Sequence, residues 1–309
     1  MRSGFLIINK PLGERSTHCV EVVRHKLGRK AKVGHGGTLD STASGVLVVL
    51  IGAATRLSNI VMGLPKCYTT TLQLGSETDT DDASGGVIRT ADFSRVTTEY
   101  IDSALFGFLG WRMQTPPNVS AVHVDGKRAH ELSRSGEDVK IAAKPVYFEK
   151  VERLSALSDG QVSFRVYCQK GTYIRSFGRD LARVLESVGH ICKLERNFVG
   201  PFKIDSALNF SEVENMTADE IYDNLLPLDT LSVVMTLYNG GEDAEKRLSC
   251  GQNVYLNTLR AVSRGEAVNY FGENVLLETE NYFAVCDVVT ENGFALLHPS
   301  VNLCLGERQ

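Results

Sequence analysis

The chemistry that this chain could perform is concentrated in a glycine-rich segment, residues 34–40 (G-H-G-G-T-L-D). Glycines permit backbone conformations and close approaches that larger side chains would block, so we expect a loop here. The segment lacks the G-x-x-x-x-G-K-[ST] spacing of a triphosphate-binding loop, and Lys32 precedes the glycines where that loop needs a following lysine. The candidate reactive group that remains is the carboxylate of Asp40, close to His35 in the chain.

Two further clusters of charged residues could support such chemistry. Arg175, Arg179 and Arg183 lie four residues apart, which places them on one face of a predicted helix. For Arg179 and Arg183 a solvated helix face is as good an interpretation as a functional one. Residues 78–86 predict a long turn with three aspartates, and we favour a capped turn over a calcium loop because the EF-hand ligand pattern is incomplete.

Apolar patterning predicts the elements that must position these groups. Residues 5–8 and 46–51 are typical of short buried strands. Thr17 is expected to cap a helix that ends in a basic stretch at residues 24–32. Alternation over residues 162–168 predicts another strand, just before the arginine-bearing helix.

Charge is unevenly distributed along the 309 residues, whose formal net charge is −4. Residues 205–309 carry 17 acidic and five basic side chains, a net charge of −12, which leaves +8 for residues 1–204. Such asymmetry indicates separate domains with separate partners. The 43% of apolar residues is ordinary globular composition, which excludes a disordered chain.

Other classes of protein are disfavoured. Seven cysteines without a C-x-x-C pair, and seven histidines without ligand spacing, indicate neither a disulfide framework nor a metal site. The first residues lack a signal-peptide pattern, and the apolar run at 46–54 is too short for a bilayer, which requires roughly 20 residues. We expect a cytoplasmic protein that needs no metal and no membrane.

Seven short motifs occur in order over most of the first 204 residues. They are K-P-x-G at 10–13, G-H-x-G-T-L-D at 34–40, K-x-Y at 66–68, L-G-x-x-T-D-T-x-D at 74–82, P-P-x-x-S-A-x-x-x-x-G-K at 116–127, K-G-T-Y-I-R at 170–175 and L-x-R-x-x-x-G-P-F at 194–202. Their types and order resemble the TruB-type pseudouridine synthases, the family of the bacterial tRNA pseudouridine-55 synthases. Within the loop, Gly36 replaces a frequent threonine, which we expect to alter loop stiffness more than chemistry.

The resemblance implies isomerisation of the T-loop uridine of tRNA, a redox-neutral reaction without a cofactor. Asp40 would react as an ionised carboxylate in a dry pocket, and Arg175 would keep it ionised. Tyr68 would stack on the target base and assist proton removal at C5. Tyr173 and Leu194 would line the same pocket. Taken alone, these aromatic residues would be ordinary core or rim residues, and Asp40 a turn or cap residue.

The resemblance also implies how RNA is held. His35 would occupy the space that the extruded uridine leaves, and residues 118–145 would fold over the RNA stem. Basic side chains would contact phosphates, with an ordinary exposed face as the rival interpretation of the stretch at 24–32. The candidates are Lys10, Arg24, Lys32, Lys127, Arg128 and Arg179.

The implied architecture is an α/β (α+β) pseudouridine synthase fold with a central mixed, mostly antiparallel sheet. The catalytic domain would span residues 1–232, and a small PUA-like β domain would span residues 233–309. We expect a monomer that binds the T-stem loop of tRNA. Two alternatives stay open: an RNA-binding or tRNA-folding protein, and a pseudouridine synthase that acts on another RNA.

Overall fold

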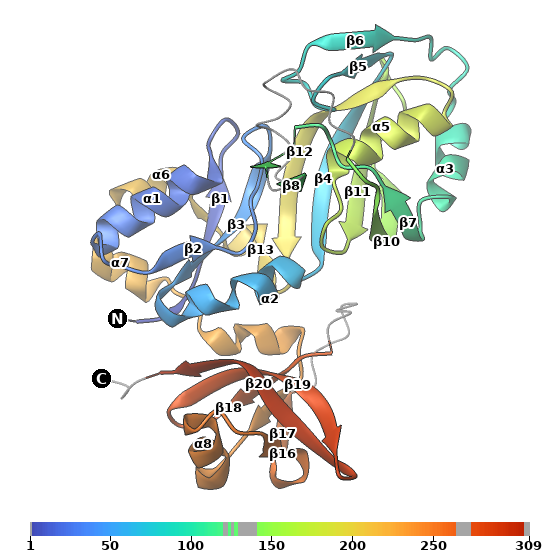
Figure 1. Ribbon diagram of the computed structural model, residues 1–309. Coiled ribbons are helices and arrows are strands. Elements are labelled where there is room, and N and C mark those ends of the chain that lie inside the picture. The colour runs from blue at the N-terminus through green and yellow to red at the C-terminus, as the bar shows by residue number, and fades with distance from the viewer. Residues whose placement is uncertain (1, 120–122, 125–126, 129–140, 264–272, 306–309) are drawn as a thin grey trace. The chain divides into compact units, whose positions relative to one another are not determined.

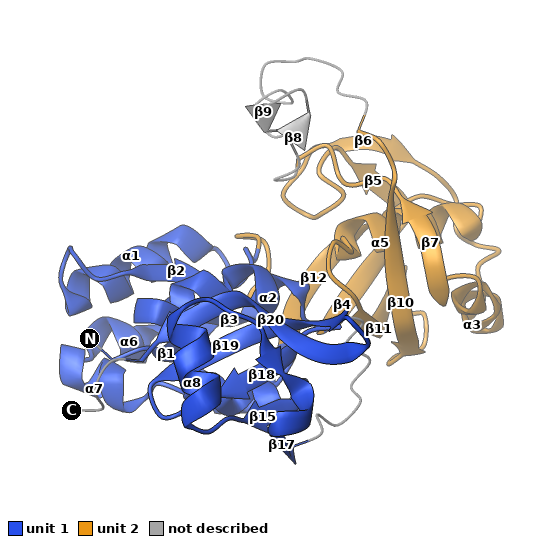
Figure 2. Cartoon of the chain, turned by 60° about the horizontal axis from the view of Figure 1, so that its bottom comes forward, with its two compact units in different colours: residues 1–39, 45–65, 198–309 blue, residues 40–44, 66–197 orange. Residues whose placement is uncertain are grey.

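The computed structural model describes residues 2–119, 123–124, 127–128, 141–263 and 273–305. Its chain forms two compact units, coloured separately in Figure 2. Unit 1 comprises residues 1–39, 45–65 and 198–309, and unit 2 comprises residues 40–44 and 66–197. Among the described residues, no helix is both long and apolar enough to cross a membrane.

Among its described residues, unit 2 contains a sheet of long strands and two helices. Its strands are β4 (Lys66–Leu74), β5 (Ser76–Thr78), β6 (Val87–Thr90), β7 (Gly110–Gln114), β8 (His123–Val124), β9 (Lys127–Arg128), β10 (Lys144–Arg153), β11 (Gln161–Cys168) and β12 (Gly189–Val199). Its helices are α3 (Thr98–Phe106) and α5 (Ile174–Val184). The sheet order is β12-β4-β11-β10-β7, and β5 pairs with β6 as a separate hairpin (Figure 1).

The register of this sheet places the K-x-Y motif opposite the end of β11. Lys66 lies opposite Cys168 and Tyr68 opposite Val166 in the antiparallel β4–β11 pair. Because side chains alternate across a strand, Lys66 and Tyr68 lie on the same face of β4. The motif therefore presents a lysine and a tyrosine to one side of the sheet.

Aromatic packing fixes helix α5 in unit 2. The ring of Phe177, in the middle of α5, lies 5.2 Å from Phe108, 5.7 Å from Phe148 and 5.8 Å from Phe164, centroid to centroid. All four side chains are buried. Rings at these separations and angles contribute packing energy beyond their buried area. The apolar face of α5 thus sets the direction in which its arginines point.

Unit 1 begins with an antiparallel strand pair and ends with a second sheet. Its strands are β1 (Gly4–Lys10), β2 (Val33–His35), β3 (Ser44–Ile51), β13 (Phe202–Lys203), β14 (Leu208–Asn209), β15 (Leu237–Asn239), β16 (Val254–Tyr255), β17 (Arg260–Ser263), β18 (Val275–Glu278), β19 (Tyr282–Glu291) and β20 (Phe294–Cys304). Its helices are α1 (Ser16–Leu27), α2 (Ser58–Gly63), α6 (Phe210–Asn215), α7 (Ala218–Asp223) and α8 (Glu242–Ser249), with short 3-10 turns at Gly52–Leu57, Ile204–Ser206, Leu228–Val233 and Leu256–Thr258.

The two faces of β1 and β3 are covered by different parts of the chain. Strand β1 pairs antiparallel with β3 and parallel with β14. One face packs on α1, α6 and α7, through residues such as Val23 and Val213. The other face shares a core with the C-terminal sheet, in which Phe5 and Val48 belong to the same cluster as Phe283. The acidic C-terminal region is therefore joined to the N-terminal strands by apolar packing.

The C-terminal sheet has six strands in the order β16-β20-β19-β18-β15-β17. Together with the mixed, mostly antiparallel sheet pairs of the two units, it confirms the predicted α/β class with a small C-terminal β domain. The strands predicted at residues 5–8, 46–51 and 162–168 are also confirmed, as β1, β3 and β11.

The predicted cap at Thr17 is wrong. Helix α1 begins at Ser16, and its N-cap residue is Arg15. The Ser16 hydroxyl donates to the carbonyl of Leu39 at 2.7 Å and accepts from its N–H at 2.9 Å. Both polar groups of Leu39 are thus bound to one buried side chain. The helix start therefore anchors the residue that immediately precedes Asp40.

Close packing explains the glycine at position 36. The Gly36 N–H donates to the Val48 carbonyl at 2.8 Å, which holds this backbone against β3. A β-carbon at Gly36 would lie 2.2 Å from Cγ1 of Val61 on α2, far inside van der Waals contact. The space that a threonine would need is therefore filled by Val61.

We predict that Gly36→Ala lowers the free energy of unfolding by about 1–3 kcal/mol, because the added methyl overlaps Val61. In a Val61→Ala background the same substitution should cost much less. Urea unfolding of the four proteins of this double-mutant cycle measures the coupling. An equal cost in both backgrounds would contradict the steric explanation.

Candidate active site

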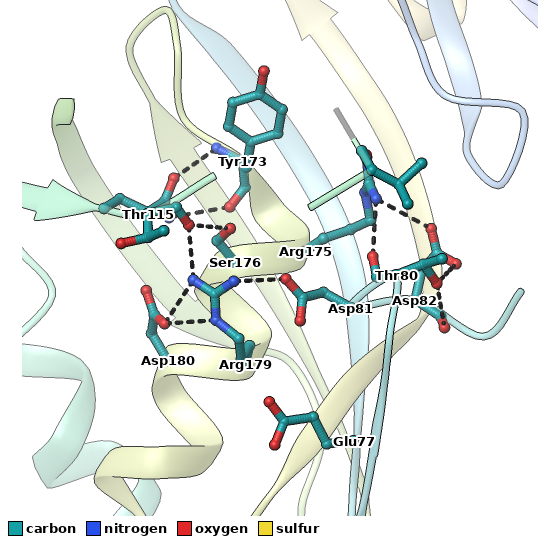
Figure 3. Close-up of polar contacts among 12 residues, drawn as sticks. Glu77, Thr80, Asp81, Asp82, Thr115, Tyr173, Arg175, Ser176, Arg179 and Asp180 are labelled. Carbon is teal, nitrogen blue, oxygen red and sulfur yellow. Dashed lines mark hydrogen bonds and ion pairs between the residues drawn. The ribbon is translucent and has the colours of Figure 1, made fainter. Parts of the chain in front are cut away.

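The centre of the candidate site is the buried guanidinium of Arg175, at the start of α5. Its side chain is 5% exposed and lies 2.8 Å from Oδ2 of Asp40 and 3.6 Å from Oδ2 of Asp82. It also donates to the carbonyls of Thr80 (2.9 Å) and Val119 (3.1 Å), and Figure 3 shows its contacts with Thr80 and Asp82. Arg175 is thus held by two carboxylates and two backbone oxygens, so its fixed donors impose a position on Asp40.

Asp82 is the buried counter-ion of this arginine. Burial acts to raise its pKa, but hydrogen bonds from Ser84 and Thr80 and the charge of Arg175 outweigh burial and lower the pKa. Asp82 Oδ1 accepts from the Thr80 hydroxyl at 2.8 Å and from the Ser84 N–H at 3.0 Å, and Oδ2 accepts from Thr42 at 3.1 Å. Asp82 is therefore an ionised residue that caps its turn, as the favoured interpretation of this cluster predicted.

Asp40 is more accessible than its partner. Its side chain is 44% exposed, so the described residues alone do not enclose it. The buried member of the pair is Arg175, because the guanidinium lies behind the carboxylate and binds the turn at residues 80–82. Asp40 thus keeps a fixed cation on one side and an open side that a substrate can approach.

Tyr68 lies on β4 with its ring buried. Burial raises the pKa of Tyr68 to about 12, against the lowering effect of the charge and hydrogen bond of Arg196, and the negative charge of Asp40 adds to the increase. Arg196 is itself 2% exposed and lies on β12. The phenol is therefore neutral at physiological pH and held by a buried cation.

Lys66, two residues before Tyr68, is also buried. Burial and the charge of Arg196 lower the pKa of Lys66 to about 7, with a further small lowering by Lys170 and an opposing effect of Cys168. About half of the Lys66 side chains therefore carry the proton at neutral pH, and the Arg196 cation lies close to them. Sequence alone offers no sign of this, because the K-x-Y spacing says nothing about burial.

Tyr173 and Leu194 are both half-buried in unit 2. Tyr173 is the N-cap residue of α5, and its backbone exchanges two hydrogen bonds with the side chain of Gln114, at 2.9 and 3.1 Å. Figure 3 shows its ring directed away from the Arg179 contacts. Gln114 thereby sets the start of the helix that carries Arg175.

His35 lies at the end of β2 in unit 1 and is half-buried. Its Nδ1 accepts a hydrogen bond from the Gly37 N–H at 3.3 Å. The acceptor role of Nδ1 leaves any ring N–H of a neutral imidazole on Nε2. Asp40 belongs to the other compact unit, so the contacts of His35 and of Asp40 are each described within one unit.

Two of the predicted phosphate-binding residues are buried instead. Lys10 is 0% exposed, and its ammonium donates to the carbonyls of Pro11 (2.9 Å) and Glu14 (2.8 Å). Arg179 is paired with Asp81 at 2.7 Å and Asp180 at 3.0 Å. Both predictions are wrong in the described structure, as is the solvated face for Arg179, because backbone oxygens and carboxylates bind these cations inside the protein.

The remaining candidates differ in accessibility. Lys32 is exposed, whereas Arg24 is half-buried and donates to the carbonyl of Val33 at 2.8 Å. Lys127 and Arg128 form β9, but their side chains lie outside the described residues, as does most of the predicted excursion at 118–145. Within the described part of the chain, no group of three His, Cys, Asp or Glu residues is arranged to hold a metal ion.

Solved structures share this fold. A Cbf5-Nop10-Gar1 complex matches with a TM-score of 0.71 and 21% identity, covering 98% of this chain and 84% of that one. The archaeal box H/ACA sRNP Nop10-Cbf5 complex matches with a TM-score of 0.69 and 20% identity, covering 98% and 86%. At these identities the similarity shows the fold alone.

Sequence comparisons identify the chemistry. Residues 24–174 match the TruB family pseudouridylate synthase (N terminal domain). "tRNA pseudouridine synthase B" of Paracoccus denitrificans is 46% identical over 225 residues, which are 73% of this chain and 74% of that protein. The protein of the same name from Ruegeria pomeroyi is 42% identical over 228 residues, 74% and 75% of the two chains. The fold and these matches define a pseudouridine synthase, an isomerase. The chain belongs to the TruB family.

We predict that Lys66→Met stabilises the protein, and more at pH 6 than at pH 9. Between the folded pKa of about 7 and the ordinary value of 10.5, the unfolded chain binds a proton that the folded chain does not, so stability rises with pH. Below pH 7 both states bind it and the full burial cost remains. The gain at pH 6 should be on the order of a few kcal/mol.

Denaturant unfolding at the two pH values measures this difference. Lys193→Met, which changes an exposed lysine on β12, is the matched control and should leave stability nearly unchanged at both. A Lys66→Met protein that is equally destabilised at pH 6 and pH 9 would show that the lysine is not held near neutrality.

Proposed function

We propose that this protein isomerises the T-loop uridine (uridine-55) of tRNA to pseudouridine, with Asp40 as the reacting carboxylate. The observation that supports this role most strongly is the ion pair between half-exposed Asp40 and buried Arg175. The names of the curated relatives support tRNA as the substrate.

The reaction breaks the N1–C1′ glycosidic bond, turns the uracil and forms a C5–C1′ bond. The proton at C5 is lost and N1 regains one, so the product is an isomer of the substrate. An ionised carboxylate that reaches the ribose can act in two ways. It can attack C1′, or it can remove a ribose proton to give a glycal. Arg175 holds Asp40 in one position for either route.

Tyr68 supports base binding in this proposal. With a pKa of about 12, roughly one phenol in 10⁵ is ionised at pH 7, so the neutral hydroxyl is the form that meets the uracil. The ring then provides a stacking face, and Tyr173 and Leu194 complete the pocket. If Tyr68 removes the C5 proton, its neutral hydroxyl must release its own proton as it accepts the one from C5, because almost no phenolate is present beforehand.

The RNA must present its uridine outside the stack. Extrusion costs a few kcal/mol of stacking, which His35 would offset by occupying the vacated space. Exposed Lys32 and the free donors of Arg24 are the described candidates for phosphate contacts near α1. Lys127 and Arg128 are further candidates from the sequence.

The organisation that we propose keeps the catalytic region at residues 1–232 and a PUA-like region at 233–309. The shared apolar cluster between β1, β3 and the C-terminal strands supports a fixed attachment of the two. The −12 charge of residues 205–309 favours a small part for that region in binding RNA. We propose a monomer that works in the cytoplasm.

Asp40→Asn tests the function. This isosteric change removes the charge that reacts, and pseudouridine formation in a T-arm stem-loop transcript should fall by at least 10⁴-fold. Arg175 keeps Asp82 as its counter-ion, so the melting temperature and the Kd for the transcript should change little. Pseudouridine is measured by mass spectrometry of nuclease fragments, and binding by filter retention.

Asp79→Asn is the matched control, because Asp79 is an exposed aspartate of the neighbouring turn, and it should keep full activity. Wild-type product levels from the Asp40 variant would contradict the role of Asp40. Product from wild-type protein on other RNAs but none on the T-arm transcript would contradict the substrate.

A further inference from the structure

A second cationic cluster lies at the other end of α5, away from Arg175 along the helix. Glu77 on β5 is buried, and Oε2 accepts from Nε and Nη2 of Arg89 at 3.0 and 2.6 Å. Its Oε1 accepts from Nη2 of Arg183 on α5 at 2.7 Å. One carboxylate thus fixes two guanidinium groups, and the trio has a net charge of +1.

The two arginines retain donors that the protein does not use in these contacts. Each guanidinium has five N–H donors. The bonds to Glu77 involve two nitrogens of Arg89 and one of Arg183, and these side chains are 55% and 51% exposed. Burial acts to raise the pKa of Glu77, but the hydrogen bonds and charges of Arg183 and Arg89 lower it overall. The Glu77 carboxylate is therefore ionised at neutral pH.

The cluster faces a cavity of about 560 Å³ between the β5–β6 hairpin and α5, two elements labelled in Figure 1. It is lined by Glu77, Ile88, Arg89, Arg183 and Ser187. Ser187 is buried, and its hydroxyl is one of the few buried polar groups among the described residues that lack a hydrogen-bond partner. The polar wall of the cavity is therefore formed mainly by the two guanidiniums and the Glu77 carboxylate.

The surroundings of the two arginines suit a ligand that has both an anionic and an apolar part, such as a nucleotide unit. Ile88 on β6 is 65% exposed and lines the cavity, so it provides an apolar surface beside the cations. The neighbouring carboxylate of Asp81 is bound to Arg179 at 2.7 Å and does not cancel the charge of the cluster. Preorganised paired guanidiniums suit the geometry of phosphate oxygens.

We propose that this cavity is a phosphate subsite, occupied by a backbone phosphodiester of the RNA substrate away from the target uridine. The inference deepens the proposed function, since it rests on an RNA substrate. A single phosphate contact adds affinity that weakens with salt, without touching the reacting atoms.

Two substitutions change the charge of the site in opposite directions. Arg89→Gln leaves the Arg183–Glu77 pair and reduces the net charge to zero, so the Kd for a T-arm transcript at 0.1 M salt should rise about five- to tenfold. Glu77→Gln raises the net charge to +2, so the Kd should fall. Arg95→Gln, an exposed arginine beyond β6, is the matched control and should leave the Kd unchanged.

Three readouts separate binding from folding and from chemistry. The slope of log Kd against log salt should decrease by about one for Arg89→Gln. The kcat at saturating RNA should stay unchanged while KM rises. Melting temperatures of all variants report on the contacts of Glu77 with Arg89 and Arg183, which join the hairpin to the helix. If these contacts were purely structural, Arg89→Gln and Glu77→Gln would both lower the melting temperature and would not change the Kd in opposite directions.

Inorganic phosphate distinguishes the source of the ligand. If phosphate raises the melting temperature of the wild type but not of Arg89→Gln, and RNA affinity is the same for both, the RNA assignment is overturned in favour of a free anion. Equal RNA affinity, salt slope and phosphate response for wild type and Arg89→Gln overturn the subsite altogether. A wild-type protein that isomerises the T-arm uridine in that case leaves the proposed function intact.

Discussion

A single buried guanidinium, that of Arg175, constrains the rest of the site. A buried cation is tolerated only where opposite charges and hydrogen-bond acceptors surround it. Arg175 has Asp82 and two backbone carbonyls behind it and Asp40 in front. The geometry of Asp40 is therefore set by contacts that the protein makes before any substrate arrives.

Helix α5 repeats the pairing of an arginine with a carboxylate along one face. Arg175, Arg179 and Arg183 pair in turn with Asp82, Asp81 and Glu77. A helix brings residues four apart onto one side, and the three pairs attach the turn and hairpin at residues 76–90 along it. The first pair lies behind Asp40, the carboxylate that we propose to react, and the last lines the cationic cavity, so one helix organises both candidate sites.

Sequence motifs paired Asp40 with Arg175, and the structure places these two side chains 2.8 Å apart, but the motifs did not predict how several other charged residues are packed. The loop at 34–40 and the arginine at 175 are recognisable from residue types and spacing, and α5 follows from its apolar period. Burial of Lys10 and Arg179 could not be predicted, because it depends on carbonyls and carboxylates that only the fold brings close. Gly36 likewise has its explanation in Val61, 25 positions along the chain and adjacent only in three dimensions.

We infer one role for Asp82, which is to position Asp40 through Arg175. Its most direct test is the single-turnover rate of pseudouridine formation by Asp82→Asn with saturating T-arm transcript. Loss of the buried charge behind Arg175 should slow this step by at least tenfold, which is about 1.4 kcal/mol in the barrier, while the Kd for RNA stays the same. A rate within twofold of the wild type, in a variant that is folded, would contradict this role of Asp82.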